Sequence, residues 1–291
     1  MTAFIFPGQG SQEPGMGRDL YDRHKAARDV FELGSDITGR DLGKLCFETD
    51  AGTLARTENA QLAVFTVSMA AYAVREDDPA AVAGFSLGEC TALCAAGALS
   101  LPDAFRLVDK RSALMRQASE GGGGAMSALL GGDAPKPYED GVDWAVPVNF
   151  NCPGQTVVAG TPGGVAVLEE RAKASGSRVT RLALSGAFHT KAMAGAGAAL
   201  KEFAKTLSFS PMRIPVYTNL TGEILPGTDD LPSHLEAQMT SPVLWQKCVE
   251  SMLTAGVTAF TEAGHGSSLA KLIRRIDRAV PVNPITPTGS V

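Results

Sequence analysis

Apolar and polar positions along this chain repeat with two periods, one typical of strands and the other of helices. Short apolar runs bounded by glycine, proline or polar residues predict buried strands, and apolar residues recurring every three or four positions predict helices. The runs predict strands at residues 3–6, 80–83, 125–130, 145–150, 156–159, 179–184, 214–217 and 259–262. The helical period predicts helices at residues 17–33, 61–75, 100–119, 163–174, 191–207, 231–239, 245–255 and 268–278, and after residue 88. Such alternation indicates an α/β fold with a mostly parallel sheet.

A run of four glycines at residues 121–124 interrupts this pattern and predicts a flexible connector. The predicted elements beyond it are strand, strand, strand, helix and strand, one helix short of a ferredoxin-like β-α-β-β-α-β unit. The interval at residues 131–141 is too short and too rich in proline for a full crossover helix, so we expect a vestigial one. We therefore predict a large α/β domain formed by residues 1–124 and 191–291, into which a small ferredoxin-like subdomain, residues 125–190, is inserted.

The composition excludes several classes of protein. Of the 291 residues, 44% are apolar and 20% are charged, which is ordinary for a globular protein and argues against a disordered or fibrous one. The net charge of −5 gives no sign of a nucleic-acid-binding surface. The start lacks the basic and apolar regions of a signal peptide, and no window of 18 or more apolar residues follows. We therefore expect a cytoplasmic protein that binds neither membranes nor nucleic acids.

The cysteines and histidines are not spaced like metal ligands. The five cysteines form no CxxC pair, and their odd number argues against a disulfide framework. Cys90 and Cys94 lie one helical turn apart, where we expect two small buried residues. The four histidines match no metal-binding pattern, so we expect no metal site.

The sequence GFSLG at residues 84–88 follows an apolar run and precedes an alanine-rich, helix-forming stretch. A strand that turns sharply into a helix holds the central serine in a strained conformation, and the flanking glycines let neighbouring chain approach it. The free N–H groups and the dipole of the helix would stabilise an oxyanion there. GxSxG also occurs by chance in glycine-rich chains, but this context predicts that Ser86 is a nucleophile.

A serine nucleophile needs a general base, and His189 is the best candidate among the four histidines. It follows a predicted strand directly and lies at the junction of the two predicted units, where clefts form. His24 lies between Arg23 and Lys25 on a polar helix face, whereas His234 and His265 lie in turn-like stretches where histidine is more often structural.

Arg111 is a further candidate because it interrupts an apolar stripe. On the predicted helix at residues 100–119, it shares one face with Ala104, Val108 and Met115. A buried guanidinium must find an anion or carbonyl oxygens as partners. Arg111 therefore binds an anionic substrate, forms a structural ion pair, or reaches water with its long side chain.

Seven motifs in a fixed order resemble those of the malonyl-CoA:acyl carrier protein transacylases, and more widely the acyltransferase domains of fatty-acid and polyketide synthases. They are FPGQGSQ at residues 6–12, GFSLGE at 84–89, RLVDKRSALM at 106–115, VNFNCPGQTVVAG at 148–160, GAFHT at 186–190, QMTSPVLW at 238–245 and EAGHGSSL at 262–269. The resemblance covers essentially the whole chain. It implies an α/β-hydrolase-like catalytic domain with an inserted ferredoxin-like subdomain.

The resemblance also implies roles for individual residues. Ser86 would be the nucleophile and His189 the base, and the backbone N–H groups of Gln9 and Leu87 would form the oxyanion hole. In this family a backbone carbonyl orients the histidine in place of an acidic side chain, and the matching position is Gln238, which would also line the substrate site.

Other residues would surround the acyl group. Arg111 would bind a substrate carboxylate through two parallel hydrogen bonds, with Met115 beside it. Phe188, directly before the histidine, is typical of malonyl-selective members, because its ring would crowd an α-methyl group. Two positions depart from the family: Phe85 replaces a usual histidine, and Cys90 replaces a frequent aromatic residue. We expect these departures to alter the pocket but to leave the chemistry possible.

The expected activity is therefore malonyl transfer from coenzyme A to the phosphopantetheine thiol of an acyl carrier protein, by a ping-pong mechanism through malonyl-Ser86. Malonyl-CoA is then a substrate, and no cofactor is expected. The alternatives are an esterase or thioesterase, an acyltransferase of other acyl specificity serving a polyketide synthase, and a non-catalytic carrier-binding module. Hydrolases of the GxSxG class have their histidine near the C-terminus, whereas His189 is followed by about 100 residues.

By the same resemblance we expect a monomer that meets an acidic carrier protein on local positive charge. The last predicted helix carries four cations, and one more lies beside the histidine motif: Lys271, Arg274, Arg275, Arg278 and Lys191. A solvated charged face would give the same pattern.

Overall fold

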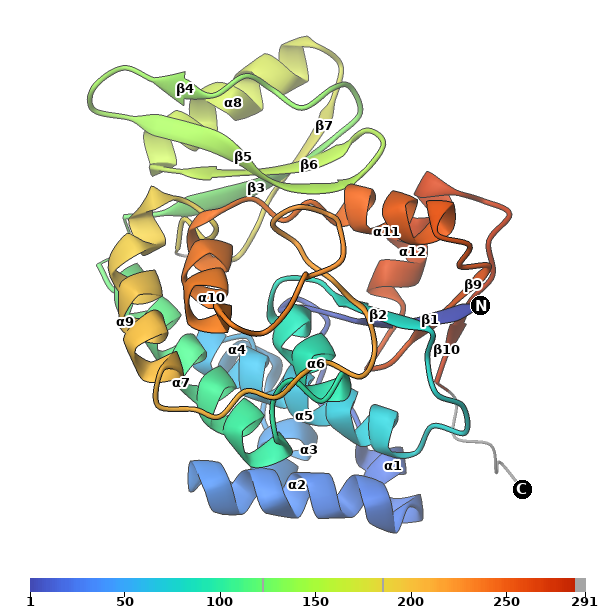
Figure 1. Ribbon diagram of the computed structural model, residues 1–291. Helices are drawn as coiled ribbons and strands as arrows, with labels where there is room; N and C mark the ends of the chain where they lie inside the picture. Colours follow the sequence, from blue (N-terminus) through green and yellow to red (C-terminus); the bar gives the residue numbers. More distant parts are fainter. Residues whose placement is uncertain (122, 185, 286–291) are drawn as a thin grey trace.

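Two five-stranded β-sheets organise the chain in the computed structural model, which describes residues 1–121, 123–184 and 186–285 (Figure 1). The first sheet is parallel and has the strand order β10-β9-β1-β2-β8. Its strands are β1 (Thr2–Phe6), β2 (Ala81–Gly84), β8 (Val216–Tyr217), β9 (Ala259–Glu262) and β10 (Val282–Pro284). Gly122, part of the predicted glycine connector, and residues 286–291 lie outside the described residues.

Helices cover both faces of the parallel sheet, so its central strands are apolar throughout. Figure 1 shows α11 and α12 on one side of the sheet and α2, α3 and α5 on the other. The helices of the large domain are α1 (Arg18–Arg23), α2 (Lys25–Thr38), α3 (Leu42–Phe47), α4 (Ala51–Leu54), α5 (Thr57–Ala73), α6 (Leu87–Ala95), α7 (Leu101–Ser119), α9 (Ala194–Ala204), α10 (Leu231–Thr240), α11 (Trp245–Thr254) and α12 (Ser268–Ile276), with a 3₁₀ turn at Lys191–Met193. Within the described ranges, none of these helices is long and apolar enough to cross a membrane.

The side chains of β1 alternate between two apolar cores, as the strand period requires. Phe4 and Phe6 pack into the core formed with α2, α5, α6 and α7. Ala3 and Ile5 face the opposite core, which includes Trp245 of α11. The carboxyl ends of β1 and β2 therefore lie side by side in the middle of the molecule, and residues that follow these strands meet there.

The second sheet is antiparallel and has the order β4-β5-β6-β3-β7. Its strands are β3 (Ala125–Leu130), β4 (Tyr138–Glu139), β5 (Trp144–Cys152), β6 (Gln155–Gly160) and β7 (Arg178–Arg181), and α8 (Pro162–Ala174) packs on one face. Without β4, the four other strands have the order of a ferredoxin-like sheet. The fold class predicted from the sequence, a parallel α/β domain with an inserted antiparallel unit, agrees with this arrangement.

The small sheet joins the large domain through β5. Val148 and Phe150 exchange backbone hydrogen bonds with Val243, which lies directly before α11. The face of the small sheet that is turned away from α8 contributes Met126 and Val157 to the core of the large domain. The chain segments that enter and leave the small sheet also lie against each other, since a Cβ on Gly124 would lie 2.3 Å from the backbone nitrogen of Ala187. The small sheet therefore packs both against the segment before α11 and against the core of the large domain.

Several predicted elements differ from the structure. The interval 131–141 contains no vestigial helix; its only regular element is the two-residue strand β4, because its prolines suit an edge strand better than a helix. The single helix predicted at residues 17–33 is divided at His24, whose backbone is extended. The last helix ends at Ile276 rather than at residue 278. The short elements α3, α4 and β10 were not predicted.

Candidate active site

Ser86 lies in the sharp turn between β2 and α6, in a backbone conformation with φ 51° and ψ −102°. Such a conformation costs a non-glycine residue about 1–3 kcal/mol. The turn requires glycine on both sides: a Cβ on Gly84 would lie 1.8 Å from the carbonyl carbon of Gly88, and one on Gly88 would lie 2.1 Å from the carbonyl oxygen of Phe6. The GxSxG pattern thus has the geometry that the sequence predicts.

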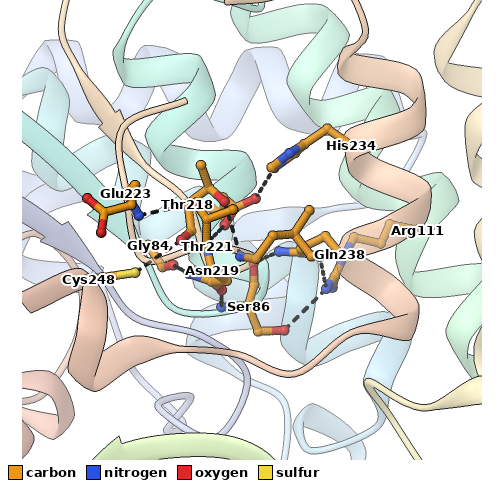
Figure 2. A network of polar contacts seen from close by, with 12 residues as sticks. Gly84, Ser86, Arg111, Thr218, Asn219, Thr221, Glu223, His234, Gln238 and Cys248 are labelled. Carbon is orange, nitrogen blue, oxygen red and sulfur yellow. Dashed lines mark hydrogen bonds and ion pairs between the residues drawn. The ribbon is translucent and has the colours of Figure 1, made fainter. Parts of the chain in front are cut away.

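Side chains from distant segments hold this turn in place (Figure 2). Asn219, in the loop after β8, accepts a hydrogen bond from the N–H of Ser86 at 2.7 Å and donates one to the carbonyl oxygen of Gly84 at 2.7 Å. Gln238 of α10 donates to the carbonyl oxygen of Ser86, also at 2.7 Å. The peptide groups on both sides of the serine are therefore fixed from outside the turn.

His189 is the nearest base to the serine. Its Nε2 lies 2.8 Å from Ser86 Oγ, and its Nδ1 lies 3.0 Å from the carbonyl oxygen of Gln238 and 3.2 Å from that of Ser241. Because carbonyl oxygens only accept, Nδ1 carries the ring proton and Nε2 is left with a lone pair toward the serine. Ser86 and His189 are also the only non-glycine residues in the described ranges with a positive φ.

The surroundings of His189 keep its ring neutral. Burial lowers its pKa, the charge of Arg111 lowers it further, and the carbonyls of Gln238 and Ser241 oppose these effects only in part, so that the pKa falls to about 4. At neutral pH the ring is therefore unprotonated and can accept a proton from Ser86.

Arg111 is 1% exposed, and α7 directs it toward the serine. It donates to Gln61 Oε1 at 2.7 Å, to Gln238 Oε1 at 3.1 Å and to Ser86 Oγ at 3.2 Å. These partners are neutral, and no partner of its Nε is found among the described residues. The structure therefore supports neither a structural ion pair nor a side chain that reaches water. Burial lowers the pKa of Arg111, which the nearby Cys90 and Glu89 counteract in part.

The two expected oxyanion donors lie beside the turn. Leu87 is the first residue of α6, and the N–H of Phe85 donates to the carbonyl oxygen of Phe6, which ties the turn to the end of β1 just before Gln9. In the described part of the chain, neither the N–H of Leu87 nor that of Gln9 has a hydrogen-bond acceptor. Both donors are therefore available to a ligand.

The remaining predicted residues pack around this centre. Met115 is buried, and its Sδ lies 3.2 Å from Gln61 Nε2. Phe188 is buried in the large apolar core. Phe85, at the position where a histidine is usual, packs edge-on against Trp245 with ring centroids 5.7 Å apart. Cys90 is fully buried, as predicted, and burial raises the pKa of its thiol to about 11.

Sequence reasoning missed four polar residues of the site: Gln61, Glu89, Asn219 and Ser241. Glu89 lies inside the GFSLGE motif and therefore left a signal, whereas Gln61 is one of several buried polar residues on α5 and does not stand out there. Ser241 lies inside the QMTSPVLW motif, whereas Asn219 reaches the turn from a loop outside all seven motifs and left no signal.

A groove of about 870 Å³ reaches this centre from the surface. It is lined by residues 134–139, by Trp144 and Phe150 of β5, and by His189 and Lys191. A smaller cavity of about 530 Å³, lined in part by His234, does not include Ser86 in its lining. The described residues contain no group of three or more His, Cys, Asp or Glu side chains placed to hold a metal ion.

Comparison with known proteins agrees with this geometry. Residues 3–290 match the family of acyl transferase domains. The chain belongs to this family. Malonyl CoA-acyl carrier protein transacylase of Bacillus subtilis (strain 168) is 39% identical over 287 residues, which cover 95% of this chain and 90% of the relative. The resemblance found in the seven motifs is thereby confirmed.

Solved structures of other members of the acyl transferase family superpose closely on this chain. Malonyl-CoA:acyl carrier protein transacylase from Xanthomonas oryzae is 36% identical with a TM-score of 0.90, covering 99% of this chain and 95% of the other. A malonyl-transacylase in complex with a type II polyketide-synthase acyl carrier protein is 32% identical with a TM-score of 0.92, covering 97% and 95%. The α/β fold with parallel and antiparallel sheets is therefore that of its relatives.

Proposed function

We propose that this chain transfers a malonyl group from coenzyme A to the phosphopantetheine thiol of an acyl carrier protein, with Ser86 as nucleophile and His189 as general base. The observation that carries the proposal is the buried guanidinium of Arg111, which lies 3.2 Å from Ser86 Oγ and has an Nε without a partner among the described residues. A cation beside the nucleophile selects an acyl group that ends in a carboxylate, because a carboxylate supplies the acceptors that the guanidinium lacks.

In the first half-reaction, His189 Nε2 takes the proton of Ser86 Oγ while Oγ bonds to the thioester carbonyl carbon. The carbonyl oxygen becomes an oxyanion, for which the N–H groups of Leu87 and Gln9 are the donors. The carbon–sulfur bond then breaks, the sulfur of coenzyme A takes the proton from His189, and malonyl-Ser86 remains.

The second half-reaction reverses these steps with the carrier thiol. His189 takes the thiol proton, the sulfur attacks the ester carbonyl, and Ser86 Oγ leaves and recovers its proton. Because coenzyme A departs before the carrier protein binds, the kinetics are ping-pong. The groove between residues 134–139 and His189 suits the long pantetheine arm of both substrates.

Mass spectrometry after incubation with malonyl-CoA tests the proposal. We expect one malonyl adduct, on the peptide that contains Ser86, and no adduct in Ser86→Ala. Added carrier protein with its phosphopantetheine arm should discharge the adduct and become malonylated. An adduct on another residue would contradict the assignment of Ser86, and discharge to water as fast as to the carrier would indicate an esterase or thioesterase instead.

A further inference from the structure

We infer that Glu89 and His234 are positioning residues for Ser86, which they hold in its reactive geometry through Asn219 and α10. The inference rests on the proposed role of Ser86 as nucleophile. Neither residue touches the serine side chain, and the mechanism above uses neither of them. Their contacts nevertheless form a continuous chain of hydrogen bonds that ends at the backbone of the nucleophile.

The chain begins at Asn219, whose side chain spans the turn from Gly84 to Ser86. A side chain can hold a strained turn only if its own backbone is fixed. The N–H of Asn219 donates to Glu89 Oε2 at 2.5 Å, and its carbonyl oxygen accepts from the N–H of Leu244 at 2.9 Å. Both peptide groups of Asn219 are therefore anchored, and Glu89 provides one of the two anchors.

Glu89 is buried and lies in the first turn of α6, three residues after the serine. Its other oxygen, Oε1, accepts a hydrogen bond from His234 Nε2 at 2.7 Å. Burial lowers the pKa of His234, but the hydrogen bond and charge of Glu89 and the charge of Asp230 outweigh burial, so the pKa is raised. The raised pKa favours the protonated form of His234, whose N–H is the partner of this buried carboxylate oxygen.

His234 also fixes α10, because it lies one turn before Gln238 on the same face of that helix. Gln238 contacts all three polar centres of the site: its Nε2 donates to the carbonyl of Ser86, its Oε1 accepts from Arg111, and its carbonyl accepts from His189. Figure 2 shows His234 and Gln238 on the same side of α10, facing the turn of Ser86. Helix α10 is therefore held at two points, by Gln238 to the turn of Ser86 and by His234 to the helix that follows this turn.

The competing interpretation is that Glu89 and His234 form an ion pair that only stabilises the fold. The two interpretations differ when both residues are replaced by apolar ones. Replacing both partners of a buried pair is often neutral or stabilising, whereas removing one leaves a buried charge alone. The double variant Glu89→Leu/His234→Phe should therefore fold, so that the effect of the pair on the reaction can be measured separately from its effect on stability.

The main measurement is the single-turnover rate at which malonyl-CoA acylates Ser86, followed by mass spectrometry. The malonyl-CoA concentration that gives half the maximal rate is taken from the same data, and the melting temperature is measured separately. We expect Ser86 to be acylated about 10- to 100-fold more slowly in His234→Phe and in the double variant, because small misplacements of reacting atoms lower the rate by such factors. The half-saturating concentration should change little, because neither residue contacts the substrate site. His234→Gln keeps an N–H donor and should restore most of the rate.

Thr221→Ala is the matched control, because Thr221 accepts a hydrogen bond from the N–H of Glu223 in the same loop as Asn219, while no hydrogen bond joins it to Asn219 or Glu89 among the described residues. It should leave the acylation rate unchanged. If His234→Phe fails to fold, the double variant decides. A folded double variant with the wild-type rate overturns the inference while leaving the proposed function intact. Absence of an adduct on Ser86 in the wild-type protein overturns the proposed function, and the inference with it.

Discussion

Arg111 and the arginines of α12 carry the same guanidinium group in opposite surroundings. Arg111 is buried and fixed by Gln61, Gln238 and Ser86. Arg274, near the end of α12, and Arg278, just beyond that helix, are exposed to water. Charges attract far more strongly where water is excluded, whereas salt largely screens exposed charges that lie more than about 10 Å apart. We therefore expect the buried cation to decide which acyl group reacts, and the exposed cations to affect only how fast a carrier arrives.

Replacing the buried cation gives the largest expected effect. Arg111→Ala should lower kcat/KM for malonyl transfer by about 30- to 5,000-fold, the equivalent of about 2–5 kcal/mol for breaking a buried charge pair. Acetyl transfer should fall little or improve, because an apolar acyl group no longer faces an unpaired cation. The measurement is the malonyl-to-acetyl ratio of kcat/KM, with circular dichroism to show that the variant is folded.

Arg111→Lys is the control for charge alone, since lysine keeps the positive charge but cannot form two parallel hydrogen bonds. It should retain part of the malonyl preference. A folded Arg111→Ala protein with the wild-type ratio would show that another residue receives the carboxylate.

The difference between buried and exposed positions also explains which features could be predicted from the sequence. Arg111 was recognisable because it interrupts an apolar stripe of α7, and the structure places Ala104, Val108 and Met115 on the same buried face. Strand β3 was predicted at its observed bounds for a similar reason, because a mostly apolar run there lies between glycines. Local periodicity thus located the elements and the unusual residue, while the comparisons confirmed the family.

Contacts between distant segments were not predictable in this way. Asn219 meets Ser86 across 133 positions of sequence, and a single amide in a loop carries no period. Strand β10 is three residues long and has one buried side chain, so it shows no alternation. The basic face of α12 was predicted as one unit, but the structure divides it. Arg275 donates to Gln155 Oε1 at 3.0 Å and therefore contacts the small sheet, whereas Arg274 does not share this contact.

Phe188 gives the second largest effect, through shape rather than charge. Its ring is buried directly before His189, and we expect it to exclude an α-methyl group from the acyl site. One methyl group in an apolar pocket is worth about 1–3 kcal/mol, so kcat/KM for malonyl-CoA should exceed that for methylmalonyl-CoA by about 10- to 200-fold. Phe188→Ala should narrow this preference without changing the malonyl-to-acetyl ratio. Equal kcat/KM values for the two wild-type substrates would contradict the role of Phe188.

The buried cation should also affect the pH dependence. His189 must be neutral to accept a proton, so activity is lost as the pH falls through its pKa, which burial and then Arg111 lower to about 4. The acid limb of kcat/KM, which reports the free enzyme, should therefore lie near pH 4 rather than near the ordinary histidine value of about 6.5. In Arg111→Ala, assayed with acetyl-CoA, the acid limb should move to higher pH because the charge of Arg111 is lost. It should not reach the ordinary histidine value, because the burial of His189 remains.

The surface variant Arg274→Glu should leave this limb in place, since its charge is screened by water. A wild-type limb near pH 6.5 would indicate that the base is less buried than the structure shows. An equal shift in Arg274→Glu would contradict the distinction between buried and exposed cations.

The exposed cations of α12 give the smallest expected effect. Arg274→Glu should raise the KM for an acidic carrier protein roughly 1.4- to 5-fold, which corresponds to the 0.2–1 kcal/mol typical of an exposed ion pair, and the KM for malonyl-CoA should stay nearly constant. Arg275 is left unchanged, because its contact with Gln155 would also disturb the small sheet. The rise in KM should disappear at high salt, where exposed charges are screened. Lys25→Glu on α2 makes the same change of charge on the side of the sheet opposite α12 (Figure 1) and should have no effect. If Lys25→Glu raises the carrier KM equally, the carrier responds to net charge alone, and if Arg274→Glu raises both KM values together, α12 does not form the docking surface.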